Sequence, residues 1–205
     1  MTIRLHRGDL PNLSGYKRSV AVDTEAMGLD PNRDRLCVVQ LSPGDGSADV
    51  IQIGAGQHKA PNIEKLLADK SILKIFHFAR FDMGILAKTF GVMAEPVYCT
   101  KIASRLARTY TDKHGLKDLA REVLGIDVSK QQQLSDWGAE ELSDAQVAYA
   151  ATDVLHLHAL KEKLDVMLAR ENRTDLAAAC FRFLPDRARL DLAGWAAEDI
   201  FSHSS

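Results

Sequence analysis

The sequence predicts an α/β fold, and three observations support this class. Runs rich in β-branched residues alternate with segments of helical periodicity through the first half of the chain. No segment after Thr100 resembles a strand, so we expect the second half to be helical. The chain has 205 residues, of which 46% are hydrophobic, and this is enough for one globular core. Strands interleaved with helices, followed by a helical part, indicate helices layered on a sheet.

The first half begins with a polar segment, residues 1–18, which we expect to form an irregular lead-in because it contains Gly8, Pro11 and Gly15. Strands are predicted at 19–24, 36–41, 48–53, 73–76 and 97–99. The first three strands are joined by short connections, so at least one neighbouring pair is expected to be antiparallel.

Helical periodicity begins at Pro61, which suits the first turn of a helix. A second helix is predicted at 80–90, where Gly91 ends it. Later helices are predicted near 101–109, 116–124, 143–169 and 171–182, followed by an amphipathic stretch at 187–201.

The charge balance excludes a general affinity for nucleic acids or membrane surfaces. Lys and Arg number 26 against 28 Asp and Glu, so any site for a polyanion must be a local patch. Three widely spaced cysteines, Cys37, Cys99 and Cys180, fit neither a zinc site nor a disulfide framework, and they predict reduced thiols and a cytoplasmic location. We expect no signal peptide and no membrane association, because no apolar run approaches the roughly 20 residues that span a bilayer.

Two carboxylates, Asp23 and Glu25, end the first predicted strand. Residues i and i+2 of a strand point to the same face, about 6–7 Å apart. Like charges at that spacing repel each other, and a cation between them would offset the repulsion. Carboxylate oxygens suit Mg²⁺ or Mn²⁺. The ordinary alternative is a strand end with two solvated acids.

Two further carboxylates lie in suggestive positions. Asp82 begins a helix just after the strand at 73–76, although the helix dipole alone would favour an acid there. Asp153 lies inside an apolar helix, four residues after Tyr149, and the alternative is a core carboxylate bonded by the phenol. Together, four carboxylates and a phenol can form a site for two divalent cations about 3.5–4 Å apart.

These residues resemble the three motifs of the DEDD 3′–5′ exonucleases, in the tyrosine-bearing branch. The motifs are Asp23-Thr24-Glu25, the segment from His77 to Asp82, and Tyr149-x-x-x-Asp153. Within this branch the chain is most similar to ribonuclease D. Further matching segments are 35–41, 115–120, 124–125, Lys130 and 135–137, so the resemblance covers roughly residues 17–170.

The resemblance implies a ribonuclease H-like fold, with a mixed five-stranded sheet that has an antiparallel edge and helices on both faces. We expect one exonuclease domain over 1–205, with a helical tail at 171–205 for packing or for an oligomer interface. Only about 35 residues follow the catalytic part, and this compact form resembles the nano-RNase C subgroup, which splits diribonucleotides. That subgroup implies a homo-oligomer, octameric in the group.

The resemblance also implies the chemistry. Asp23, Glu25, Asp82 and Asp153 would hold two Mg²⁺ or Mn²⁺ ions, and Tyr149 would orient the attacking water. The substrate would be short single-stranded RNA, cleaved from its 3′ end to nucleoside 5′-monophosphates. The expected substrate-binding residues are Thr24, Met27, Gly28, Leu29, His77, Arg105, Lys113, His114 and Lys117.

Residues 27–29 are included because glycine permits close backbone approach, and an apolar side chain can wedge between bases. The alternative is a plain turn. The basic residues are included because a dense run, which also contains Lys101, Arg108 and Lys130, could grip phosphate; the alternative is a solvated helix face. Two other functions remain open: an exonuclease on longer RNA or on DNA, and an inactive module that binds nucleic acid.

Overall fold

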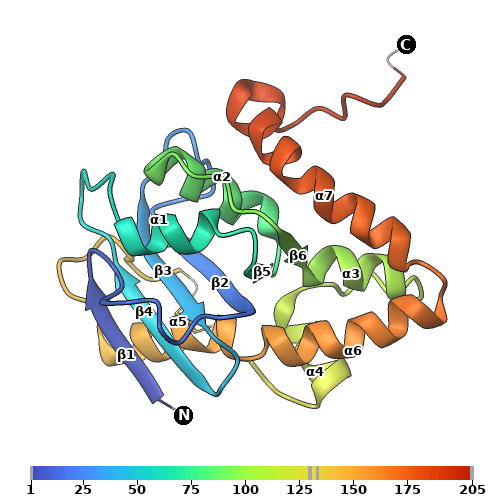
Figure 1. Cartoon of the computed structure of the whole chain (residues 1–205), viewed down its shortest axis with the longest axis horizontal. Coiled ribbons are helices and arrows are strands. Elements are labelled where there is room, and N and C mark those ends of the chain that lie inside the picture. Colours follow the sequence, from blue (N-terminus) through green and yellow to red (C-terminus); the bar gives the residue numbers. More distant parts are fainter. Residues whose placement is uncertain (1, 129–130, 133, 204–205) are drawn as a thin grey trace.

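The computed structural model describes residues 2–128, 131–132 and 134–203 (Figure 1). Its strands are β1 (Thr2–Arg7), β2 (Ser19–Ala26), β3 (Leu36–Ser42), β4 (Ser47–Gln52), β5 (Leu73–Phe76) and β6 (Val97–Cys99). Its helices are α1 (Pro61–Ala68), α2 (Ala79–Phe90), α3 (Thr100–Ala107), α4 (Leu116–Leu124), α5 (Asp144–Leu155), α6 (Leu157–Arg170) and α7 (Thr174–Leu190), and a π-helical turn, η1 (Asp191–Trp195), follows α7.

The strands form one mixed sheet in the order β1-β4-β3-β2-β5-β6. Within the described part of the chain, β3 is antiparallel to both of its neighbours, while the pairs β1–β4, β2–β5 and β5–β6 are parallel. The carboxyl ends of β2, β4 and β5 therefore lie at one edge of the sheet. The α/β class and the antiparallel pairs are confirmed, but the described residues form a sheet of six strands rather than the predicted five.

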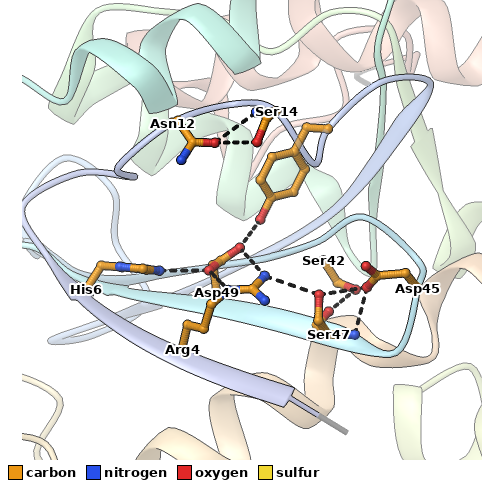
Figure 2. Close-up of polar contacts among 9 residues, drawn as sticks. Arg4, His6, Asn12, Ser14, Ser42, Asp45, Ser47 and Asp49 are labelled. Carbon is orange, nitrogen blue, oxygen red and sulfur yellow. Dashed lines mark hydrogen bonds and ion pairs between the residues drawn. The ribbon is translucent and has the colours of Figure 1, made fainter.

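The additional strand is β1, where the sequence indicated an irregular lead-in. Buried Asp49 of β4 holds it in place, accepting hydrogen bonds from Arg4 Nε at 2.7 Å and from Tyr16 Oη at 2.6 Å, and His6 Nε2 lies 2.7 Å from Asp49 Oδ1 (Figure 2). Burial would raise the pKa of Asp49, but hydrogen bonds from Arg4, Tyr16 and His6 lower it to about 2. Because these bonds join distant segments, residues 1–18 alone did not reveal the strand.

Helices cover both faces of the sheet (Figure 1). On one face, Val20 and Val22 of β2 belong to a core cluster with residues of α1 and α2. On the other face, Ala21 belongs to a second cluster with residues of α4, α5 and α6. This alternation places Asp23 and Glu25 on the α5 face of β2, because they share the parity of Ala21.

The helical part differs from the prediction in two places. The helix expected at 143–169 is divided at His156 into α5 and α6. The amphipathic stretch expected at 187–201 is not a separate element, because α7 continues through Pro185 to Leu190, where Leu184 and Ala188 are buried.

The C-terminal segment is attached to the first turn of α2. Asp191 accepts hydrogen bonds from Arg80 and, at 2.5 Å, from Arg187 Nη2. Arg80 also donates to the carbonyl of Ala196 at 2.6 Å. In the described residues, no helix has the length and apolarity to cross a membrane, and all three cysteines are free thiols.

Candidate active site

Three carboxylates meet at the end of β2. Asp23 and Glu25 lie opposite Gln40 and Val38 of β3, and a break in register after Glu25 ends the regular pairing. Helix α5 packs across β2 and brings Asp153 to the same place. One oxygen from each of Asp23, Glu25 and Asp153 lies within 4.8 Å of the others, so the three side chains can reach a single cation.

Asp82 approaches this cluster from the other face of the sheet. It lies in the first turn of α2 and is only 3% exposed. Thr24, which points away from the α5 face, donates a hydrogen bond from Oγ1 to Asp82 Oδ1 at 2.6 Å. Asp82 interacts electrostatically with Asp23 and Asp153, so all four predicted acids are neighbours at this edge.

The environment of the four acids disfavours their charged forms. Burial, followed by repulsion from Asp82, Asp153 and Glu25, raises the pKa of Asp23 well above its usual range. Burial and neighbouring acids raise the pKa of Glu25 to about 8, and burial raises the pKa of Asp82 and of Asp153 to about 7. In the described part of the chain, no cationic side chain is among the main contributors to these pKa values.

Three half-buried carboxylates beside the buried Asp82, with no cation among their main electrostatic partners, suit a hard divalent ion such as Mg²⁺ or Mn²⁺. The residues present therefore fit the metal that the sequence motifs implied. Metal binding would displace protons from the cluster, because ligating carboxylates must be ionised.

Tyr149 lies one turn before Asp153 on α5, and its ring packs against Trp137 with centroids 6.0 Å apart. Burial, followed by the charges of Asp153, Glu25 and Asp23, raises the pKa of the Tyr149 phenol. The phenol is therefore protonated at neutral pH. It can orient a water by hydrogen bonding, but it is too weak an acid to serve alone as the base.

The loop of residues 27–34, between β2 and β3, carries the predicted wedge residues. Leu29 is 89% exposed and Met27 is 61% exposed, so both are free to contact a base. Gly28 has a structural role beside its predicted contact with substrate, which stays a prediction. A Cβ at position 28 would lie 2.1 Å from Asp34 Oδ2, so glycine makes room for a side chain of the protein itself.

Basic side chains gather beside the carboxyl end of β5. His77, Lys101, Arg105 and His114, here called the basic cluster, are linked by mutual electrostatic interactions. His77 Nδ1 lies 2.9 Å from Thr100 Oγ1, and that hydroxyl itself donates to the carbonyl of Phe76. Burial, followed by the charge of Lys101, lowers the pKa of His77 to about 3, so this imidazole is neutral.

The rest of the predicted basic run divides into three groups. Arg108 is fully buried, and it donates to Ser104 Oγ at 2.8 Å and to the carbonyl of Lys113 at 2.9 Å and pairs with Glu122. Its guanidinium is thus a structural group and does not face substrate. Lys113 is exposed and Lys117 is half-buried at the start of α4. Lys130 lies outside the described residues.

The sequence interpretation missed Phe78, which precedes α2 and is 45% exposed. Its backbone is left-handed, with φ of 69°, which is a strained conformation for a residue with a bulky side chain. Lys101 Nζ lies 4.4 Å from the ring centroid. The available signal was a large apolar residue placed between a strand and a helix, next to His77.

The chain is similar to proteins of known family. The model of the 3′–5′ exonuclease family matches residues 10–169. Ribonuclease D of Gluconacetobacter diazotrophicus is 36% identical over 169 residues, which is 82% of this chain and 42% of that protein. Ribonuclease D of Acidiphilium cryptum is also 36% identical, over 82% of this chain and 43% of that protein. The chain thus spans about two fifths of the length of these relatives.

Solved structures include close matches over the whole chain. NrnC of Brucella melitensis with bound Mg²⁺ is 63% identical, with a TM-score of 0.96 and coverage of 100% of both chains. The same protein bound to pGG is 64% identical, with a TM-score of 0.97 and the same coverage. Ribonuclease D of Escherichia coli, 24% identical over 84% of this chain and 45% of that one, shares the fold with a TM-score of 0.75. The chain therefore belongs to the 3′–5′ exonuclease family, as a homologue of ribonuclease D and of NrnC.

Proposed function

We propose that this protein is a metal-dependent 3′–5′ exoribonuclease that hydrolyses very short RNA, with diribonucleotides as its preferred substrates. One observation carries the proposal: Asp23, Glu25, Asp82, Asp153 and Tyr149 gather at one sheet edge, although they come from three separate elements. Membership of the exonuclease family and the Mg²⁺-bound NrnC relative support the same chemistry.

Asp23, Glu25 and Asp153 would hold one divalent cation, and Asp82 together with Asp23 would hold a second. Bound Mg²⁺ or Mn²⁺ would supply an activated water and charge stabilisation for the leaving 3′ oxygen. Tyr149 would use its protonated Oη to orient that water for in-line attack. Thr24 would keep Asp82 in place through their hydrogen bond.

The 27–34 loop would limit where the bases can lie. Leu29 and Met27 are exposed close to the acids and would pack against the terminal base. Glu25 would contact the 3′ hydroxyl. Such contacts are tolerant of sequence, because every base offers an apolar face. We therefore expect little dependence of the rate on the identity of the bases.

The basic cluster would select substrate length. Arg105 and His114 would hold a 5′ phosphate, with exposed Lys113 and half-buried Lys117 at the margin of the site. Phe78, whose ring makes a cation–π contact with Lys101, would stack against the 5′ base. A phosphate site at a fixed distance from the acids would favour one length, and the pGG complex of the NrnC relative supports a short substrate.

A length series of 5′-phosphorylated RNA, from two to seven nucleotides, tests the proposal with Mg²⁺ or Mn²⁺ present. We expect mononucleotide release with a steep preference for the dinucleotide. Equal rates at all lengths would support the alternative of a ribonuclease D-like enzyme on longer RNA, and equal rates on deoxyribose substrates would extend it to DNA. Undiminished binding without hydrolysis would support the inactive module.

We also propose that the protein functions as a homo-oligomer, with the octamer of the group it resembles as the expected size, and that 171–205 serves packing and assembly within one exonuclease domain. Trp195 is 44% exposed and Phe201 is 76% exposed, which is costly for an isolated surface. Light scattering on the purified protein tests the assembly. Fractionation of cells tests the cytoplasmic location.

A further inference from the structure

Gln40 in the middle of β3 is unusual among the buried polar residues. It is 0% exposed, and neither its amide nitrogen nor its amide oxygen has a hydrogen-bond partner. Within the described residues, it is the one side chain with two such atoms. A buried polar group without a hydrogen bond costs about 1–3 kcal/mol. A fully buried primary amide without a partner is therefore expected to gain a hydrogen bond when a ligand binds nearby.

The register of the sheet places Gln40 beside the metal-binding acids. It lies directly opposite Asp23 on β2, so the two side chains project from the same face of the sheet. On its other side Gln40 faces Val50 of β4, which offers no polar group. The α5 face above it is lined by alanine and valine, including Ala150 and Val154.

The carboxylate of Asp23 can accept a further hydrogen bond. Its carboxylate accepts a hydrogen bond from the backbone N–H of Thr24, and its other charged neighbours are the acids Glu25, Asp82 and Asp153. Carboxylates that bind metals are generally held by further hydrogen bonds, which fix their orientation. Directly opposed side chains have Cβ atoms about 4.5–5.5 Å apart, within reach of a glutamine amide.

From this arrangement we propose that Gln40 is a positioning residue for the metal site: its amide N–H, unpaired in the metal-free protein, donates to the carboxylate of Asp23 when a divalent cation binds, and fixes the orientation in which Asp23 holds that cation. The inference rests on the proposed metal-dependent function. It assigns no contact between Gln40 and the substrate or the cation.

The test uses two apolar variants of similar volume, Gln40→Met and Gln40→Leu, so that the result does not depend on one of them folding. Mn²⁺ alone is the probe, and its affinity is measured by titration calorimetry and by the paramagnetic resonance of free Mn²⁺. We expect the affinity to fall about tenfold or more, because second-layer contacts have effects of 10–100-fold. Hydrolysis should recover when Mn²⁺ is raised by the same factor.

Thermal unfolding without metal separates positioning from a structural role. The variants should be as stable as the parent, because they remove an unpaired amide. Ser42→Ala is the matched control, since Ser42 lies on the same face of β3 and its hydroxyl donates to the carbonyl of Ser47 at 2.7 Å. The control should lose stability without losing Mn²⁺ affinity.

Two results would overturn the inference in distinguishable ways. If the parent binds Mn²⁺ and the Gln40 variants bind it equally well, the positioning role is wrong while the proposed function stands. If the parent does not bind Mn²⁺ at all, the proposed function fails and the inference fails with it.

Discussion

Replacement of Asp153 by asparagine tests the electrostatic cost of the acid cluster. The side chain keeps its shape and loses its charge. Burial raises the pKa of Asp153 from 3.8 to about 7, and the side chain is only partly exposed. Because the folded-state pKa is the higher one, ionisation of Asp153 destabilises the fold at every pH above its unfolded value.

The size of this cost follows from linkage. Each pKa unit corresponds to about 1.4 kcal/mol, so the change from 3.8 to about 7 gives at most about 4 kcal/mol at pH 8. The partial exposure of Asp153 to water and proton sharing among the four acids reduce it to roughly 2 kcal/mol. Near pH 4 the carboxyl is protonated in the folded state and nearly half protonated in the unfolded state, so the effect should shrink to roughly 0.5 kcal/mol.

Urea unfolding with a chelator present measures the effect. We expect Asp153→Asn to be more stable than the parent by about 2 kcal/mol at pH 8 and by no more than roughly 0.5 kcal/mol at pH 4. Mg²⁺ should stabilise the parent at pH 8 and stabilise the variant much less, because binding to the folded state adds to its stability. Asp165→Asn is the control, since Asp165 lies on α6, where it pairs with Lys161. Equal stability of parent and Asp153→Asn at pH 8 would refute the account of unpaired, repelling acids.

Three further predictions address other parts of the site. Tyr149→Phe keeps the packing against Trp137, so kcat should fall about 100-fold with KM and Tm nearly unchanged, and an unaltered kcat would exclude a role for the phenol. Arg108→Met leaves the Lys113 carbonyl without its hydrogen-bond donor, so the free energy of unfolding measured in urea should fall by roughly 2 kcal/mol. An unchanged midpoint of the urea transition would contradict a structural role. Gly28→Ala places a Cβ against Asp34, so it should lower the free energy of unfolding by roughly 1–3 kcal/mol and raise KM. Gly15→Ala is the control, because a Cβ there meets open space and should change neither quantity.

The sequence was sufficient to predict which elements carry the four acids and Tyr149, while their catalytic roles stay predictions. Asp23 and Glu25 share a face because strands alternate, and Tyr149 and Asp153 share one because helices repeat every 3.6 residues. The approach of Asp82 from the other face, and its bond with Thr24, could not be predicted, because both depend on how α2 lies across the sheet.

The errors have the same origin in contacts between distant segments. The strand β1 depends on Asp49, which Arg4 contacts across 45 positions of the chain. Arg105 and Arg108 looked equivalent in the sequence, yet one is exposed and the other is buried against Glu122 of α4. The pattern of a helix face shows which residues are polar, but it does not show which neighbour will cover them.

The shared carboxylate of Asp191 has a consequence for how the enzyme acquires its activity. Arg80 precedes Asp82 by two residues in the same helical turn, and its guanidinium is neutralised by Asp191, 111 positions further along the chain. The first turn of α2 is therefore completed only when the segment around Asp191 and Ala196 has been made and docked. A nascent chain that lacks this segment would hold the four acids in an unfinished frame, so the proposed cleavage of RNA would begin only after the segment had docked.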